Sequence, residues 1–262
     1  MNNNCRITGA PLKELFTLGE LYVNDFVPGD EVTKRDKVDL TVGIGPTGLV
    51  QLTQSYNPDK MYKTYWYHSS TNELMREQLE DLRSKTVSFT HLEDGDTVLG
   101  IAANDGQELV GYSNEDKVLV KVGVDPSDVA RESSLYSKHN ISLINDYFSA
   151  DAYLKRFSRA KVITLAAMFY DLDDPRAVVR DIAKCLDPFG VLGLQLSYLP
   201  LILMQNSYDG IGEEHLCYYT LKILLSIFAD EGLLPLDVEL NDVNSGSIRI
   251  YFGHKEYVKR YP

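Results

Sequence analysis

From residue 97 to the end of the chain, short apolar runs alternate with stretches in which apolar residues recur at helical spacing. Apolar runs of strand length occupy residues 97–101, 118–124, 141–144, 162–166, 191–196, 236–240 and 247–252. Alternating strands and helices predict a mainly parallel sheet with helices on both faces. Because the last two runs are close in the sequence, they predict an antiparallel pair at one edge. The expected fold is α/β and Rossmann-like, with a seven-stranded sheet.

The first 60 residues show a different pattern, in which glycine and proline interrupt short apolar pieces such as residues 49–52. This pattern predicts a small, irregular, β-rich lobe whose core is thin for independent stability. We therefore expect two parts, a lobe over residues 1–70 and a main domain over residues 71–262. Asn72 is placed to cap the first helix of the main domain, which is expected to run to about Ser84.

Composition and charge narrow the classes of function. The chain has 262 residues, of which 44% are hydrophobic, so a sizeable core is expected. The formal charge of −12 repels phosphate backbones and no basic cluster offsets it, so nucleic acid is not an expected partner. No apolar run has the length of a membrane span, and the N-terminus lacks the apolar core of a signal peptide. The three cysteines are far apart and suggest no disulfide framework, which favours the cytoplasm.

Polar residues follow three of the predicted strands, at the end where open α/β sheets bind ligands. In chain order they are Asn104, Asp105 and Gly106, then Asp125 and Pro126, and then Asn145 and Asp146. The glycine lets the backbone approach a ligand closely. The Asp125 carboxylate can accept hydrogen bonds from both hydroxyls of a ribose, and the third position is where an adenine could be held.

The chemistry of these positions indicates the class of ligand. The glycine-rich fingerprint of dinucleotide sites is absent, and Asp105 in the first loop would repel a pyrophosphate. A nucleoside that carries positive charge and no phosphate fits better. S-adenosylmethionine has these properties, because its sulfonium and amino groups are cationic and its ribose is free. We therefore expect S-adenosylmethionine as the cofactor.

A second group of reactive residues lies at 209–219, where glycines and an aspartate predict a loop. The segment holds Glu213, Glu214 and His215, followed by Tyr218 and Tyr219. A helix is expected after it, because Thr220 can cap one and Gly232 can end one. Taken alone, the segment is more typical of a solvated acidic loop with one surface histidine than of a catalytic loop.

An aromatic run precedes the main domain, at residues 61–68. Tyr65, Tyr67 and His68 could line a ligand pocket, because aromatic rings form much of the wall of such pockets. They could equally seal the join between the lobe and the main domain.

Taken together, these segments resemble the S-adenosylmethionine-dependent sugar C-methyltransferases, which act on nucleotide-activated deoxysugars. The resemblance extends over nearly the whole chain and rests on the order and spacing of its motifs. The motifs are GLVQL (48–52), YWYHS (65–69), IAANDG (101–106), GVDPS (123–127), DP (174–175), EHLCYY (214–219) and SGSIR (245–249).

The resemblance implies a class I methyltransferase fold and a role for each motif. Residues 102–106 would cradle the cofactor, beginning at Ala102, and Asp125 would bind its ribose. Glu214 and His215 would belong to the catalytic loop. The implied reaction removes a proton from a carbon next to a keto group, and the resulting enolate attacks the methyl group. A histidine held by a carboxylate suits the role of base at neutral pH.

The implied substrate is a small molecule, a nucleotide sugar or a related compound, and the expected contacts are Tyr65, Tyr67, His68, Tyr218 and Tyr219.

The chain departs from the family at several positions. Of the four N-terminal zinc ligands only Cys5 is kept, with Thr8, Ile44 and Thr47 at the others, so we expect no zinc.

Other departures replace side chains that the family uses in its site. Gly100 and Ala102 replace an aspartate and a glycine, and Ala167 and Asp171 replace an asparagine and a histidine. A tyrosine and a histidine before the catalytic pair are Gly212 and Glu213, and the family's further C-terminal domain is absent from the 262 residues.

Three functional hypotheses follow. The first is an active C-methyltransferase, which we favour because Asp125, Glu214 and His215 are kept. The second is a degenerate methyltransferase fold used as a binding or assembly module. The third is a small-molecule methyltransferase that acts on oxygen or nitrogen, which needs fewer catalytic groups.

Overall fold

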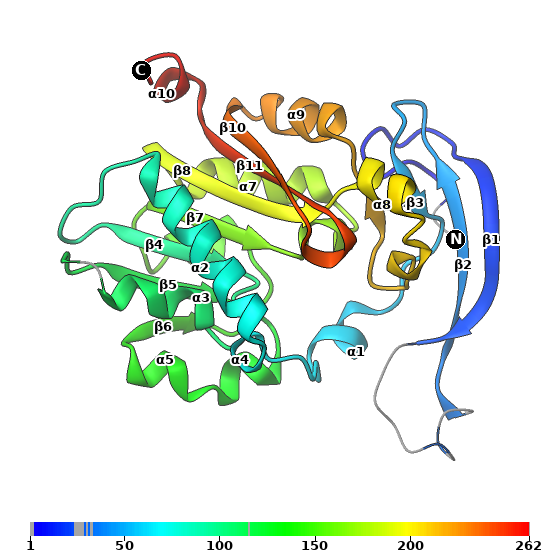
Figure 1. Ribbon diagram of the computed structural model, residues 1–262, viewed down its shortest axis with the longest axis horizontal. Helices are drawn as coiled ribbons and strands as arrows, with labels where there is room; N and C mark the ends of the chain where they lie inside the picture. Colours follow the sequence, from blue (N-terminus) through cyan, green and yellow to red (C-terminus); the bar gives the residue numbers. More distant parts are fainter. Residues whose placement is uncertain (1–2, 24–28, 30, 32–33, 115, 262) are drawn as a thin grey trace.

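Two sheets form the framework of the computed structural model, which describes residues 3–23, 29, 31, 34–114 and 116–261 (Figure 1). The larger sheet has seven strands in the order β10-β11-β8-β7-β4-β5-β6. Its strands are β4 (Thr97–Ile101), β5 (Val120–Val124), β6 (Ile141–Ile144), β7 (Ala160–Ala166), β8 (Leu186–Ser197), β10 (Leu233–Asn241) and β11 (Ser247–His254). The neighbours from β8 to β6 pair in parallel, and β11 is antiparallel to both β8 and β10. The predicted Rossmann-like α/β fold with an antiparallel edge pair is confirmed.

Helices cover both faces of this sheet (Figure 1). On one face, Leu82 of α2 packs with Val191 and Tyr251 of the sheet. On the other, buried residues of α7 and α9 join those of the strands in the main core. The helices are α1 (Pro58–Tyr62), α2 (Glu73–Ser88), α3 (Gln107–Val110), α4 (Asp128–Glu132), α5 (Ser134–Lys138), α6 (Ala150–Leu154), α7 (Pro175–Cys185), α8 (Leu199–Gln205), α9 (Leu221–Ala229) and α10 (Lys255–Val258).

Two predicted helix starts have different outcomes. Asn72 caps α2 as predicted, since its Oδ1 accepts a hydrogen bond from the Met75 amide, but the helix continues one turn beyond Ser84 to Ser88. Thr220 occupies the position before α9, yet its hydroxyl makes no capping bond. That helix is held instead by burial of an apolar face, formed by Ile223, Leu224, Ile227 and Phe228.

The smaller sheet lies beside the first and has the strand order β1-β2-β3-β9, all antiparallel. Its strands are β1 (Lys13–Tyr22), β2 (Lys37–Ile44), β3 (Val50–Leu52) and β9 (Cys217–Tyr218). The last of them comes from the segment after His215, so the reactive loop is anchored to this sheet. One apolar core includes Leu49 and Leu52 of this region together with Leu165 and Leu194 of the large sheet, which is how a thin lobe is stabilised.

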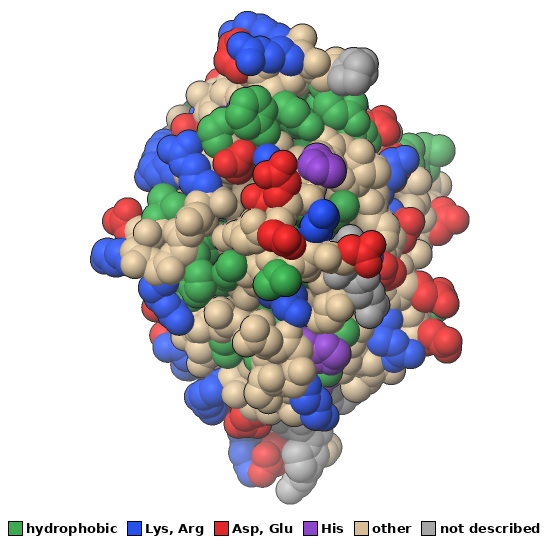
Figure 2. Space-filling view, turned by 90° about the vertical axis from the view of Figure 1, so that its left-hand side faces the viewer, with side chains coloured by type: hydrophobic (Ala, Val, Ile, Leu, Met, Phe, Trp, Pro, Cys, Tyr) green, Lys and Arg blue, Asp and Glu red, His purple; other side chains and the backbone are tan. Residues whose placement is uncertain are grey.

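The surface carries charges of both signs. On the face shown in Figure 2, Lys and Arg side chains alternate with Asp and Glu, and no broad region of one sign stands out. A surface that follows a nucleic acid backbone gathers positive charge, which this face does not do. Within the described residues, no helix combines the length and the apolar character that crossing a bilayer requires.

Candidate active site

A tight loop follows β4 at the carboxyl end of the sheet and forms the first part of the site. Ala102, Asn104 and Gly106 have φ angles of 54°, 51° and 85°, all in the left-handed region. Such a conformation is costly for alanine and is usual only where surrounding contacts enforce it. The loop therefore turns sharply at the carboxyl end of β4, where residues 103–106 are buried. We refer to residues 102–106 as the cradle.

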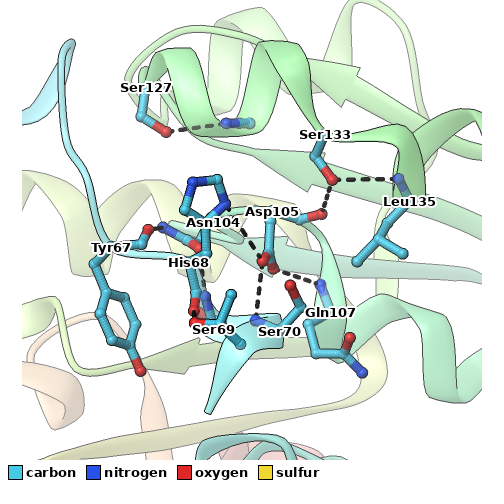
Figure 3. Close-up of polar contacts among 12 residues, drawn as sticks. Tyr67, His68, Ser69, Ser70, Asn104, Asp105, Gln107, Ser127, Ser133 and Leu135 are labelled. Carbon is cyan, nitrogen blue, oxygen red and sulfur yellow. Dashed lines mark hydrogen bonds and ion pairs between the residues drawn. The ribbon is translucent and has the colours of Figure 1, made fainter.

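The aromatic segment is tied to this cradle (Figure 3). The Asn104 Oδ1 accepts a hydrogen bond from the Ser69 amide at 2.9 Å, and its Nδ2 donates to the Tyr67 carbonyl at 2.9 Å. The Asp105 Oδ2 accepts from the Ser70 amide at 2.9 Å and lies 4.0 Å from the His68 Nδ1. Residues 67–70 therefore border the cradle, which places Tyr67 and His68 beside the expected cofactor site.

Asp125 directly follows β5 and holds the cradle from the other side. Its Oδ2 accepts a hydrogen bond from the Asn104 amide at 2.8 Å, and its Oδ1 accepts from the amide and hydroxyl of Ser127 at 2.9 and 2.5 Å. The residue is buried, with 7% exposed. Because a carboxylate oxygen can accept two hydrogen bonds, Oδ2 retains capacity for a ligand hydroxyl.

Asn145 serves the loop that contains Asp125 and Pro126. Its Nδ2 donates to the carbonyls of Asp125 and Ser127, both at 2.9 Å, which uses both hydrogens of the amide. Any contact with an adenine would therefore fall to the Asn145 carbonyl oxygen. The neighbouring Asp146 is exposed, and its Oδ1 accepts from the Tyr147 amide.

A cavity of about 290 Å³ adjoins the second group of predicted residues. It is lined by Tyr170, Ser197, Ile202, Ser207, Asp209, Gly210, His215, Cys217, Tyr218, Asn244 and Ser245. These residues come from the short 3-10 helix after β7, from the end of β8, from α8, from the segment 207–218, and from the turn between β10 and β11. The cavity lining contains no Lys or Arg, so it offers no cationic partner to a phosphate group.

His215 has a defined orientation in this cavity. Its Nδ1 lies 2.8 Å from the Gly210 carbonyl, and because a carbonyl can only accept, Nδ1 carries the hydrogen. The Nε2 then holds a lone pair and can act as a base. The Tyr170 ring packs on the imidazole with centroids 4.3 Å apart. Burial lowers the pKa of His215, against a smaller opposing effect of the Gly210 bond and Glu213, so the ring is neutral at pH 7.

The carboxyl next to His215 is also perturbed. Burial raises the pKa of Glu214 to about 7, the nearby Glu213 charge adds to this effect, and the Tyr65 hydroxyl opposes it. The carboxyl therefore exchanges its proton near neutral pH, as an acid–base group should. Cys217 differs, because burial raises the pKa of its thiol to about 11, which keeps it from acting as a thiolate.

The structure places some of the expected substrate contacts at the site and one of them in the core. Tyr218 lines the cavity, and Tyr65 lies next to Glu214. Tyr219, in contrast, is fully buried and packs against Phe169 with ring centroids 5.3 Å apart. The prediction that Tyr219 contacts substrate is therefore wrong. Successive side chains of β9 and the residue after it point to opposite sides, so only one of the two tyrosines faces the cavity.

The sequence did not identify Tyr62, Tyr170 or Asp171 as site residues, yet all three lie around Glu214 and His215. The Asp171 carboxyl is buried, and its Oδ1 has no hydrogen-bond partner among the described residues. Burial and the Glu214 charge raise the pKa of Asp171 well above its usual range. The sequence feature that could have identified Asp171 is its position just after a predicted strand, where the ligand contacts of α/β sheets collect.

The positions equivalent to the zinc ligands lie together in the small lobe. Burial would raise the pKa of the Cys5 thiol, but hydrogen bonds with Thr8 and Thr47 hold it below its ordinary value. One thiol and two hydroxyls do not supply the ligand set of a structural zinc site. Among the described residues, no group of three or more His, Cys, Asp and Glu side chains is placed to hold a metal. The absence of zinc stays a prediction.

Comparison with known proteins gives both a family and a fold. A family model described as a methyltransferase domain matches residues 71–237. The C-methyltransferase NovU from Streptomyces niveus is 26% identical over 206 residues, which are 78% of this chain and 48% of NovU. The chain thus spans about half the length of that curated relative.

Solved structures share the fold at low sequence identity. The plantazolicin methyltransferase BpumL, in complex with a substrate analogue and SAH, matches with a TM-score of 0.57 and 11% identity over 71% of this chain and 87% of that chain. The N-methyltransferase NodS from Bradyrhizobium japonicum WM9, in complex with S-adenosyl-l-homocysteine, matches with a TM-score of 0.51 and 14% identity over 70% and 88%. Since the family model covers more than half of the 262 residues, this chain belongs to the methyltransferase domain family.

Proposed function

We propose that this protein is an S-adenosylmethionine-dependent methyltransferase. The observation that carries the proposal is the joining of Asp125, at the end of β5, to the Asn104 amide of the cradle at 2.8 Å. This arrangement brings a ribose acceptor and the turn of the cradle to one point of the sheet edge. The acidic residues Asp105 and Asp125 suit a ligand that carries positive charge and no phosphate.

The residues that would hold the cofactor follow from this geometry. The Asp125 Oδ2 would accept a hydrogen bond from the ribose, and the cradle from Ala102 to Gly106 would face the amino acid end. Asp146 and the carbonyl of Asn145 would border the adenine. When bound, S-adenosylmethionine supplies a methyl group on a sulfonium, which nucleophiles attack. Tyr67, whose carbonyl accepts a hydrogen bond from Asn104, and His68, whose Nδ1 lies 4.0 Å from Asp105 Oδ2, would border the same space.

For the acceptor, we infer a carbon next to a keto group. His215 lines the cavity, and its Nδ1 donates to the Gly210 carbonyl, so its unprotonated Nε2 can take a proton from carbon. The electron pair of the broken C–H bond would then remain on the acceptor as an enolate, whose carbon would form the new bond to methyl while the methyl–sulfur bond breaks and its electron pair stays on sulfur. Oxygen and nitrogen acceptors already have lone pairs, so a dedicated base is of most value for carbon. The similarity to NovU, a C-methyltransferase, supports this inference.

We further infer that the acceptor is a small molecule such as a keto-sugar nucleotide. The cavity volume of about 290 Å³ accommodates a sugar-sized group. Since its lining lacks Lys and Arg, the nucleotide part would extend out of the cavity, and only the sugar would enter it.

An assay with labelled S-adenosylmethionine and a set of keto-deoxysugar nucleotides tests the function. We expect methyl transfer, and nuclear magnetic resonance of the product should find the new methyl on the carbon next to the carbonyl. A methyl on oxygen or nitrogen would contradict C-methylation while keeping the enzyme class. Cofactor binding without transfer to any acceptor would favour a degenerate module.

A further inference from the structure

One buried arginine of the small lobe contacts several separate segments of the chain near the candidate active site. Arg6 is 8% exposed, and its backbone amide donates to the Gln51 Oε1 at 2.8 Å. Its Nη1 donates to the Leu52 carbonyl at 2.6 Å, its Nη2 to the Ser55 hydroxyl at 2.8 Å, and its Nε lies 3.3 Å from the Asp173 Oδ1. A guanidinium carries five N–H donors in a rigid plane, so it can fix the relative positions of the groups that it joins.

The contact with Leu52 leads to the backbone of the reactive loop. Leu52 belongs to β3, and its amide donates to the Leu216 carbonyl at 2.9 Å. The strand β3 also pairs with β9, which begins one residue after Leu216. Arg6 therefore holds the strand to which the residue after His215 is bonded.

The ion pair with Asp173 leads to the aromatic ring that packs on the imidazole. Asp173 lies two residues after the short 3-10 helix Phe169–Asp171, and this helix carries Tyr170. The Tyr170 ring lies against that of His215 with centroids 4.3 Å apart. Arg6 therefore also holds the segment from which this ring projects.

We propose that Arg6 is a positioning residue for His215, because one guanidinium fixes both the backbone after the histidine and the segment whose ring packs on it. This inference rests on the proposed function, since it takes His215 as the base. A base must lie within hydrogen-bond reach of the proton that it removes, and a displacement of about 1 Å can cost about 100-fold in rate. Arg6 is not among the residues that line the cavity, so it acts through the loop and not by contact with the acceptor.

A second arginine offers a matched control, because it also joins the small lobe to the main domain. Arg176 of α7 donates from its Nε to the Ile7 carbonyl at 3.0 Å, and from its Nη1 and Nη2 to the Asp230 carboxylate at 2.8 Å each. These contacts involve neither Leu52 nor Asp173. The variant Arg176→Met therefore reports the effect of losing a purely structural link between the lobe and the main domain.

Nuclear magnetic resonance of the imidazole nitrogens tests the proposal without substrate or cofactor. In the full chain with isotope-labelled histidine, the His215 signals are identified by their absence from His215→Gln. The wild-type ring should show a single tautomer with the hydrogen on Nδ1, because this atom donates to the Gly210 carbonyl. In Arg6→Met the signals should indicate a mixture of the two tautomers, and in Arg176→Met they should match the wild type.

Methyl transfer gives the second readout. Single-turnover transfer by Arg6→Met should fall about 10- to 100-fold. Its affinity for S-adenosylmethionine should be unchanged, because none of the contacts described for Arg6 involves the cradle. Arg176→Met should lower the melting temperature but keep the wild-type rate of transfer.

Asp173→Ala keeps the proposal testable if Arg6→Met does not fold. The Asp173 side chain is 54% exposed, so water can take the place of its carboxylate. This variant should show the same two changes to a smaller extent, because the contact between Arg6 and Leu52 remains.

Two results would overturn the proposal. One is a wild-type tautomer of His215 in the folded Arg6→Met or Asp173→Ala protein, and the other is an equal loss of transfer in Arg176→Met. Failure of the wild-type protein to bind S-adenosylmethionine or to transfer methyl would instead remove the proposed function. The imidazole signals would still decide whether Arg6 positions His215.

Discussion

Replacing Asp125 by alanine should abolish useful cofactor binding. The carboxylate accepts hydrogen bonds from the Asn104 amide, the Ser127 amide and the Ser127 hydroxyl, and it is the expected acceptor for the ribose. Hydrogen bonds to charged groups contribute about 1.5–3 kcal/mol, and the loss of one such ligand contact together with the cradle's anchor should weaken binding by at least ~100-fold. Calorimetric titration of the variant with S-adenosylmethionine measures this change.

Asp125→Asn is a control that keeps the shape of the side chain and removes its charge. The amide keeps one oxygen acceptor and the side-chain volume, so the cradle should persist with binding weakened by about tenfold. The alanine variant also leaves two buried backbone amides unpaired, which should destabilise the fold by about 1–3 kcal/mol for each amide and lower its melting temperature. An alanine variant that still binds at the wild-type affinity would exclude Asp125 from the cofactor site.

The second large effect is expected for His215→Gln, which should lose methyl transfer while keeping the cofactor. Glutamine is similar in size and can donate to the Gly210 carbonyl, but it has no basic nitrogen in place of Nε2. Loss of a general base costs about 10²- to 10⁴-fold in kcat. Single-turnover transfer from labelled S-adenosylmethionine measures the change, and calorimetry with the same ligand measures retained binding.

Hydrogen exchange at the acceptor carbon separates the role of base from a role in packing. In deuterated water without cofactor, the wild-type protein should exchange the hydrogen next to the keto group, and His215→Gln should not. Wild-type exchange that persists in the variant would place the base elsewhere, with Glu214 as the next residue to test because burial raises its pKa to about 7.

The cofactor side of the site was accessible from the sequence, because it depends on a rule of topology. Residues that follow successive parallel strands must meet at one edge, so Asn104, Asp105 and Asp125 could be brought together from strand order alone. The hydrogen bond from the Asn104 amide to the Asp125 carboxylate agrees with that prediction. The sequence could not show that Asn145 uses its amide nitrogen to support the Asp125 loop, since such a contact depends on the local path of the backbone.

The acceptor side was less accessible, because it is assembled from segments with no periodic pattern. The strand β9 has two residues, which is too short to be seen as alternation, yet it decides that Tyr218 faces the cavity while Tyr219 enters the core. The sequence showed Asp171 as a departure from a family pattern and as a residue that follows a strand, but not as a neighbour of Glu214. Its burial beside Glu214 arises from the packing of the two sheets, which no local signal encodes.

The central claim is that the cradle closed by Asp125 binds S-adenosylmethionine. Its most direct test is a calorimetric titration of the purified wild-type protein with this ligand near neutral pH, followed by a thermal melt with and without ligand. We expect one site per chain with micromolar affinity, and a higher melting temperature in the presence of the ligand. No heat of binding and no thermal stabilisation at millimolar ligand would contradict the claim.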